Sequence, residues 1–208
     1  MAKITPFEEH SEIYDDWFTK NSDKYAAELF ALKSFIPANA HGLEVGVGSG
    51  KFADPLGIKI GVEPSPKMAE KARKLGIQVL PGIAEDLPIQ SSTFDFVLMV
   101  TTICFVDDLK KSFQEAFRVL KDGGFIVIGF IDKESELGKV YRANKDKSHF
   151  YNIAEFFSTQ EVLACLSESG FENFETRQTI FPGSDTQRIE NGFGTGSFVV
   201  IKGLKTNK

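Results

Sequence analysis

The stretch Leu43-Glu44-Val45-Gly46-Val47-Gly48-Ser49-Gly50 decides the fold, because a short hydrophobic run leads directly into three alternating glycines. The hydrophobic run over 43–47 predicts a buried strand. Glycines immediately after a strand permit a tight turn and let the backbone approach a ligand closely. The segment therefore predicts a ligand-binding turn at the end of a strand.

The residues around this turn exclude the two commonest phosphate-binding motifs. The dinucleotide pattern G-x-G-x-x-G needs a glycine where Lys51 stands, and a P-loop needs Ser or Thr where Phe52 stands. Glu44, two residues before the first glycine, suits a positively charged ligand better than a pyrophosphate. Glu63 ends the next predicted strand, where a carboxylate can accept two hydrogen bonds from a ribose diol.

Short hydrophobic runs alternate with amphipathic segments along the chain, which predicts a mostly parallel sheet covered by helices on both faces. The expected strands are 43–47, 59–63, 77–80, 94–100 and 125–130, followed by an antiparallel pair at 173–181 and 197–202. The expected helices are 7–19, 22–36, one from a Ser65 cap to Gly76, one capped by Asp107 or Asp108, and one from a capping box at 158–161 to Gly170. A second glycine series, 192–196, precedes a strand and is predicted to be a mobile turn.

Five motifs in the same order resemble those of class I S-adenosylmethionine (SAM)-dependent methyltransferases. They are Glu-x-Gly-x-Gly-x-Gly at 44–50, Gly-Val-Glu-Pro-Ser-Pro-Lys-Met at 61–68, Gly-Ile-Ala-Glu-Asp-Leu-Pro at 82–88, Thr-Phe-Asp-Phe-Val at 93–97 and Leu-Lys-Asp-Gly-Gly at 120–124. The segments 156–158, 169–171 and 196–201 are similar to the small-molecule branch typified by quinone-biosynthesis enzymes. The resemblance implies one Rossmann-like, doubly wound α/β domain over 1–208. Its seven strands would lie in the order 3-2-1-4-5-7-6, with the last strand antiparallel.

The resemblance also implies SAM as cofactor, S-adenosylhomocysteine (SAH) as product, and in-line methyl transfer to a small-molecule acceptor. The residues expected to bind the cofactor are Glu44, Gly46, Gly48, Gly50, Glu63, Pro64, Met68, Ala84, Glu85 and Thr101. The residues expected to line an acceptor pocket are mainly aromatic: Tyr14, Trp17, Thr102, Phe105, Tyr141 and Tyr151. Residues 1–40 are expected to form a helical cap, and 132–157 a lid or substrate insertion.

Two departures from the family pattern leave chemical roles open. Ile83 stands where the family often has an Asp that binds the adenine amino group, so Glu85, a carbonyl or water would have to replace it. Cys104 and Phe105 stand where the family often has a His. His149 and Tyr14 are the candidates for a catalytic role, with core packing as the alternative for Tyr14, Trp17 and Met68 and a structural role as the alternative for His149.

Composition limits the kinds of partner that the chain is expected to bind. The 208 residues include 24 Lys and Arg against 29 Asp and Glu, and this acidic balance argues against nucleic acid as a partner. No hydrophobic run is long enough for a membrane span, and the start lacks a signal-peptide pattern, so a cytoplasmic location is expected. The two cysteines and three scattered histidines have no metal-ligand spacing.

Two other functions stay open at this point. One is a nicotinamide or nucleotide binder on a similar sheet, against which Lys51 argues. The other is a non-catalytic protein of the same fold that still binds SAM. The sequence leaves the acceptor, the atom that is methylated and the oligomeric state open.

Overall fold

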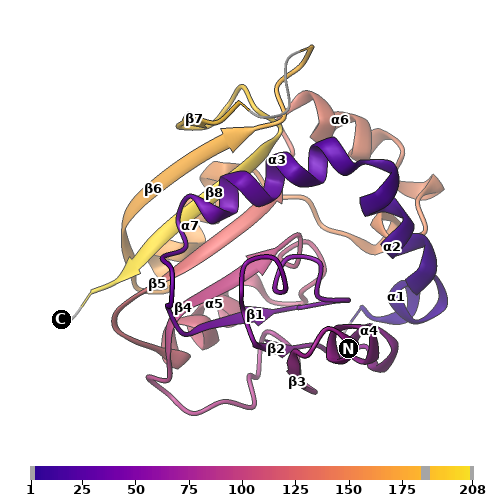
Figure 1. Cartoon of the computed structure of the whole chain (residues 1–208). Helices are drawn as coiled ribbons and strands as arrows, with labels where there is room; N and C mark the ends of the chain where they lie inside the picture. The colour runs from indigo at the N-terminus through magenta and orange to yellow at the C-terminus, as the bar shows by residue number, and fades with distance from the viewer. Residues whose placement is uncertain (1–2, 184–187, 207–208) are drawn as a thin grey trace.

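The computed structural model describes residues 3–183 and 188–206, so residues 184–187 of the predicted connection 182–196 lie outside it. The described strands form one sheet in the order β3-β2-β1-β4-β5-β8-β6-β7 (Figure 1). Their bounds are β1 Gly42–Val45, β2 Ile60–Val62, β3 Gln78–Leu80, β4 Phe94–Val100, β5 Leu120–Ile131, β6 Phe171–Thr179, β7 Glu190–Asn191 and β8 Phe198–Lys205.

The sheet confirms the predicted strand order. β3, β2, β1, β4 and β5 pair in parallel, whereas β8 pairs antiparallel with both β5 and β6. The structure adds one short strand, β7, which pairs antiparallel with β6 at the edge of the sheet. This strand lies in the connection that the sequence predicts as a turn, because two residues are too few to give a strand pattern.

Helices cover both faces of the sheet, as the repeated β-α-β pattern predicts. α3 (Ser22–Lys33) and α4 (Pro66–Lys74) pack on one face, and α5 (Leu109–Val119) and α7 (Thr159–Glu168) on the other (Figure 1). Alternate side chains of β4 enter opposite layers: Leu98 packs in the core beneath α3 and α4, and Met99 in the core beneath α5 and α7. Both faces of β4 are therefore buried, which explains its uninterrupted hydrophobic sequence.

Local capping signals place the helix ends as predicted. The Ser65 hydroxyl accepts a hydrogen bond from the Met68 amide, and the Asp108 carboxylate accepts one from the Lys111 amide. At the start of α7, Ser158 and the residue three positions later form a reciprocal capping box. Asp108, one of the two residues that the sequence predicts for this role, is thus the cap of α5.

The N-terminal helix predicted over 7–19 is instead two helices, α1 (Thr5–Glu9) and α2 (Ser11–Lys20). The break is at His10, whose backbone angles (φ −123°, ψ 29°) are not helical. The Glu8 carboxylate accepts hydrogen bonds from the Ser65 hydroxyl and the Lys67 amide at the start of α4. The break therefore lets α1 dock on α4 while α2 continues toward α3 (Figure 1).

The segment 132–157, which the sequence predicts as a lid or substrate insertion, forms a broken helix. It contains α6 (Glu136–Ala143) and two short 3₁₀ turns, η1 (Lys145–Lys147) and η2 (Tyr151–Ile153). The buried Asp132 carboxylate fixes its base by accepting hydrogen bonds from the amides of Glu134 and Thr159.

Candidate functional site

The glycine loop joins the carboxyl ends of β1 and β2. The amides of Gly46 and Val47 donate to the Val62 carbonyl at 2.8 and 3.1 Å. Gly46, Gly48 and Gly50 all have positive φ, at 71°, 55° and 85°, which L side chains rarely adopt. The chain can therefore turn sharply at the sheet edge where the ends of the parallel strands meet.

The three glycines meet different surroundings. A Cβ on Gly46 would lie 2.5 Å from the Thr102 side chain, and one on Gly50 would lie 2.8 Å from Ile77. A Cβ on Gly48 would have ordinary contacts of 3.6 Å with Met68 and with the Tyr14 hydroxyl. Packing thus explains glycine at 46 and 50, whereas Gly48 leaves open a space that lines a pocket.

Glu63 ties two loops together at the bottom of this pocket. Its carboxylate accepts hydrogen bonds from the amides of Gly48 and Ser65, both at 2.9 Å. Burial raises the pKa of Glu63 to about 7, although the two amides act in the opposite direction. The free lone pairs of this carboxylate remain able to accept hydrogen bonds from a ligand.

Glu44 lies beneath the loop and has one unsatisfied oxygen. Its side chain is 1% exposed and accepts a hydrogen bond from the Ala53 amide. Within the described residues, Glu44 Oε2 has no hydrogen-bond partner. Burial raises the pKa of this carboxyl, with a smaller contribution from the nearby Glu63. A positively charged ligand group nearby would stabilise its ionised form.

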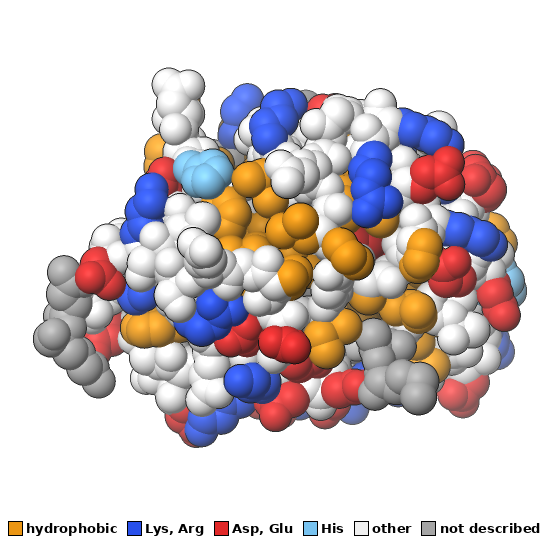
Figure 2. All heavy atoms as spheres, turned by 90° about the horizontal axis from the view of Figure 1, so that it is seen from below, with side chains coloured by type: hydrophobic (Ala, Val, Ile, Leu, Met, Phe, Trp, Pro, Cys, Tyr) orange, Lys and Arg blue, Asp and Glu red, His pale blue; other side chains and the backbone are white. Residues whose placement is uncertain are grey.

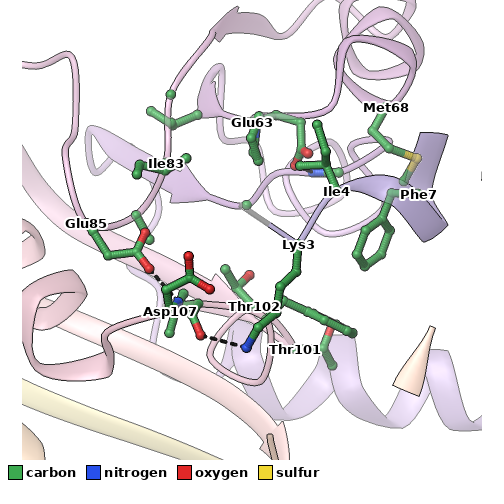
Figure 3. Close-up of a pocket in the computed structure, with 18 of the residues that line it drawn as sticks. Lys3, Ile4, Phe7, Glu63, Met68, Ile83, Glu85, Thr101, Thr102 and Asp107 are labelled. Carbon is green, nitrogen blue, oxygen red and sulfur yellow. Dashed lines mark hydrogen bonds between the residues drawn. The ribbon is translucent and has the colours of Figure 1, made fainter. Parts of the chain in front are cut away.

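The pocket beside the glycine loop, here called the first pocket, brings together most of the residues predicted to bind the cofactor (Figure 3). Its lining includes Gly46, Gly48, Glu63, Pro64, Met68, Ala84, Glu85 and Thr101. Glu44 and Gly50 lie outside that lining. Thr102, which is predicted on the acceptor side, lines the first pocket instead, and its hydroxyl donates to the Val45 carbonyl.

The N-terminal segment also lines the first pocket, through Lys3, Ile4 and Phe7. Figure 3 shows Lys3 reaching across the pocket, where its ammonium donates to the Val106 carbonyl at 3.1 Å. The sequence before residue 7 carries no motif that points to this position.

Glu85 fixes the far side of the first pocket. One of its oxygens accepts hydrogen bonds from the amides of Asp107 and Asp108, at 2.6 and 3.2 Å (Figure 3). Ile83, two residues earlier, is 37% exposed and lines the same side. Glu85 therefore already holds the loop after β4 with one oxygen.

A second pocket, here called the aromatic chamber, lies beside the first. Its volume is about 300 Å³ and its lining includes Trp17, Tyr141, Tyr151 and His149. Four residues line both pockets and form a shared wall: Phe7, Tyr14, Thr101 and Phe105. The structure thus brings both predicted groups of residues to adjoining cavities.

Ring contacts hold the shared wall and the insertion against each other. Phe7 packs edge-on against Tyr14 and Phe105, with ring centroids 5.9 and 5.0 Å apart. Tyr151 stacks on Phe105 at 6.3 Å and on Tyr141 at 5.0 Å. These contacts connect α1, α2, the loop after β4 and the insertion around one cavity.

The two candidates for a catalytic role occupy different places. Burial raises the pKa of the Tyr14 phenol, with further increases from Glu44 and Glu63, so this hydroxyl remains protonated at neutral pH. His149 is exposed at the edge of the chamber and packs at a tilt against His10, with ring centroids 4.3 Å apart. Tyr14 therefore faces both pockets, whereas His149 lies at the chamber's solvent side.

Sequence reasoning missed Glu28, a buried carboxylate in the lining of the aromatic chamber. A signal was present: Glu28 stands three residues after Tyr25 and four before Leu32, on the helix side that the hydrophobic spacing predicts to be buried. A charged residue on such a stripe is uncommon unless it is paired or functional.

Metal binding and membrane insertion are the remaining alternatives for residues 3–183 and 188–206. No group of three or more His, Cys, Asp and Glu side chains in this part of the chain could hold a metal ion. None of the helices described there has the length and hydrophobicity needed to cross a membrane. Hydrophobic side chains gather near the middle of the face seen in Figure 2, with charged side chains around them.

Comparison with known proteins identifies the family. Residues 43–128 match the family described as a methyltransferase domain. A SAM-dependent methyltransferase from Thermotoga maritima, described as a possible histamine N-methyltransferase, is 48% identical with a TM-score of 0.94; the match covers 98% of this chain and 100% of that one. An uncharacterized protein of Methanocaldococcus jannaschii is 46% identical over 96% of this chain and 98% of its own.

A ubiquinone/menaquinone biosynthesis C-methyltransferase of Rickettsia prowazekii is 29% identical over 178 residues, which are 74% of this chain and 68% of its own. These similarities point to the same family as the glycine loop and the strand order do. The chain belongs to the class I SAM-dependent methyltransferases, and SAM is its cofactor.

Proposed function

We propose that the chain transfers the methyl group of SAM to a small-molecule acceptor bound in the aromatic chamber. The observation that carries this proposal is the wall of Phe7, Tyr14, Thr101 and Phe105, which lines both pockets. A methyl donor in the first pocket and an acceptor in the second would meet at this wall. Holding two reactants in such an arrangement can supply about 7–11 kcal/mol of the barrier reduction.

The first pocket fits SAM on three observations of the structure. Gly48 leaves free the space that a Cβ would fill, and Glu63 is placed to accept hydrogen bonds from the ribose diol. The unsatisfied Glu44 oxygen beneath the loop suits the positive end of the cofactor. Ile83 and Ala84 would lie against the adenine ring, since they line the opposite side of the pocket.

SAM, when bound, supplies a methyl group on a sulfonium, which is already reactive. The protein then has to align the acceptor and exclude water, and the aromatic side chains of the shared wall are suited to both tasks. The Tyr14 hydroxyl, which stays protonated, can donate a hydrogen bond but cannot serve as a base at neutral pH.

The chamber's lining supports a small and partly flat acceptor rather than a polymer. Its volume of about 300 Å³ and its many rings are typical of sites for small molecules. The names of relatives agree with this class, since one is described as a possible histamine N-methyltransferase and another acts in quinone biosynthesis.

Two measurements test the proposal. Titration calorimetry should show SAM and SAH binding and no binding of NAD. A methyl-transfer screen over small amines, thiols, phenols and quinol precursors, with each product identified by mass spectrometry, should then give a methylated product. Tight NAD binding without SAM binding, or SAM binding with no transfer to any acceptor class, would contradict the proposal.

A further inference from the structure

One buried carboxylate lines the aromatic chamber without a partner. Glu28, on α3, is 4% exposed, and among residues 3–183 and 188–206 no hydrogen bond or ion pair reaches its carboxyl oxygens. The remainder of the lining is largely aromatic and aliphatic. An isolated carboxylate in such surroundings destabilises a fold, so packing alone does not explain its presence.

The charge of Glu28 acts on the side chains around the chamber. It contributes to the raised pKa of Tyr14, of Tyr141 and of Tyr151, after the larger effect of burial. Burial likewise raises the pKa of Glu28 itself to about 8, against a smaller opposite effect of Lys24. Glu28 and these three tyrosines line the same cavity.

The chamber's other charged and titratable groups leave Glu28 available to a ligand. The titratable side chains that share the lining with it are Tyr14 from α2, Lys24 from α3, and Tyr141, Lys147, His149 and Tyr151 from the insertion. Lys147 and His149 are exposed, and Lys24 is half-buried without forming an ion pair with Glu28. Among the described residues of this lining, Glu28 is therefore the one buried carboxyl group.

Acidic, neutral and basic acceptors would interact differently with the Glu28 carboxylate, and this difference indicates the class of acceptor. An acidic acceptor would place a second negative charge against it, and a neutral hydrocarbon would leave it unsatisfied. A protonated amine would pair with it, while the rings pack against the acceptor's hydrocarbon body and attract its positive charge.

We propose that the acceptor is a small amine with a flat hydrocarbon or heteroaromatic body, and that Glu28 binds its nitrogen. This inference rests on the proposed function, because it assigns the acceptor class of the same chamber. An ammonium gives one proton to the Glu28 carboxylate and becomes a neutral amine with a free electron pair. The nitrogen then forms a bond to the methyl carbon as the C–S bond breaks, the C–S pair stays on sulfur, and Glu28 releases the proton to solvent.

Calorimetry on SAH-loaded protein tests this inference with four matched compounds: 2-phenylethylamine, 2-phenylethanol, 2-phenylethanethiol and 3-phenylpropanoate. The wild type should bind the amine most tightly. Glu28→Gln should weaken amine binding by about 10-fold or more and leave alcohol binding unchanged, because only the charged partner is lost. Glu136→Gln, an exposed carboxylate on α6 next to the chamber residue Leu137, should leave amine binding unchanged.

A pH series adds a readout that a purely structural role would not change. Amine affinity of the wild type should rise as the pH increases through about 8, where the Glu28 carboxyl ionises, and this rise should be absent in Glu28→Gln. Preferential binding of the alcohol, the thiol or the acid, no amine binding, or unchanged amine binding in Glu28→Gln would overturn the inference.

Transfer to a non-amine acceptor with Glu28→Gln fully active would overturn the amine assignment while leaving the proposed function intact. By contrast, SAM binding without transfer to any compound of the methyl-transfer screen would count against the proposed function itself. SAM affinity should be the same in wild type and Glu28→Gln, since Glu28 lines only the chamber.

Discussion

The same seven-residue pattern, Glu-x-Gly-x-Gly-x-Gly, occurs twice in this chain, at 44–50 and at 190–196, and the two copies have different structures. The first follows the central parallel strand β1 and lines the first pocket. The second begins with β7 at the sheet edge and leads into the antiparallel strand β8. The spacing of glycines therefore makes a binding loop only where it ends a buried parallel strand beside a second one.

In each copy, a buried side chain from a neighbouring strand or loop accepts hydrogen bonds from the backbone amides of the glycine loop. Glu63 accepts a hydrogen bond from the Gly48 amide, and Gln178 accepts from the amides of Thr195 and Gly196. The acidic residues differ as well: Glu44 is buried with an unsatisfied oxygen, whereas Glu190 forms an ion pair with Arg188. The first copy retains binding capacity, and the second is satisfied within the protein.

The largest effect is expected from Gly48→Val compared with Gly194→Val. Gly48→Val should weaken SAM binding by about 10–100-fold or more, because overpacking a fitted site costs about 1–3 kcal/mol. Gly194 occupies the equivalent position of the second copy, has a positive φ of 103° and would meet nothing within 4 Å. Gly194→Val thus reproduces the backbone strain without filling the pocket. Calorimetry should show wild-type SAM affinity for Gly194→Val, and equal losses in both variants would contradict the assignment of Gly48.

The next largest effect concerns the side chains that hold the two loops. Glu63→Ala should weaken SAM binding by about 1.5–3 kcal/mol, the contribution of hydrogen bonds to a charged group. Gln178→Ala should lower the melting temperature and leave SAM affinity unchanged, because Gln178 binds only the edge loop. If Glu63→Ala bound SAM as tightly as the wild type does, the ribose would have to lie elsewhere.

Glu63 also predicts a pH dependence. Its carboxyl has a pKa raised to about 7, so it loses its charge as the pH falls through 7. A neutral carboxyl accepts hydrogen bonds less strongly, and SAM affinity should therefore decrease below about pH 7. The same titration with Glu63→Gln should be flat in this range; a parallel decrease in the variant would assign the dependence to another group.

Substitutions in the aromatic chamber should reduce turnover more than they reduce stability. The residues of the second glycine copy do not line this chamber. Once an acceptor is known, Tyr14→Ala and Tyr151→Ala should reduce kcat by about 10-fold or more, since misplacing reactants by about 1 Å can cost about 100-fold. Phe117→Ala is the matched control, because Phe117 packs edge-on against Phe171 and neither ring lines either pocket. It should lower the melting temperature and leave the turnover of folded molecules unchanged.

If Tyr14→Ala and Tyr151→Ala instead behaved as the control does, their rings would be core residues and the acceptor site would lie elsewhere. Melting curves and turnover measured on the same preparations separate the two outcomes.

The smallest effect is expected on stability, from Glu44→Gln compared with Glu190→Gln. Burial raises the folded-state pKa of Glu44 above its ordinary value of 4.5, so the folded chain loses stability as the pH rises above that value. Glu44→Gln removes this loss and should raise the melting temperature at pH 7 by about 2–4 °C while weakening SAM binding. Glu190→Gln should change neither, and a lower melting temperature for Glu44→Gln would contradict the account.

The sequence predicts the parts of the molecule whose signals are local. Hydrophobic runs such as 94–100 predict the strands, whereas their order in the sheet is implied by the family resemblance. Ser65 and Asp108 mark helix starts through hydrogen bonds within one turn. Gly48 and Glu63 can also be predicted from local patterns. Each lies just after a short hydrophobic strand, and the two residues are hydrogen-bonded to each other in the structure.

The chamber could be predicted only in part, because it is assembled from side chains that meet in three dimensions. Lys3 lies across the first pocket although no sequence motif points to that position, and no helix-stopping residue marks the break at His10. Glu28 stands on a hydrophobic stripe but its cavity depends on the insertion that closes over α2 and α3. The second glycine copy also shows that a local pattern is insufficient. Its sequence pattern is complete, but it does not end a buried parallel strand.

A crystal structure of the protein with SAH tests the central claim most directly, namely that the first glycine copy and Glu63 bind the cofactor beside the aromatic chamber. We expect the SAH ribose hydroxyls within hydrogen-bond distance of the Glu63 carboxylate, the adenine against Ile83, and the sulfur at the wall of Phe7, Tyr14, Thr101 and Phe105. SAH bound at the second glycine copy, or bound in the first pocket with its sulfur facing away from this wall, would contradict the account.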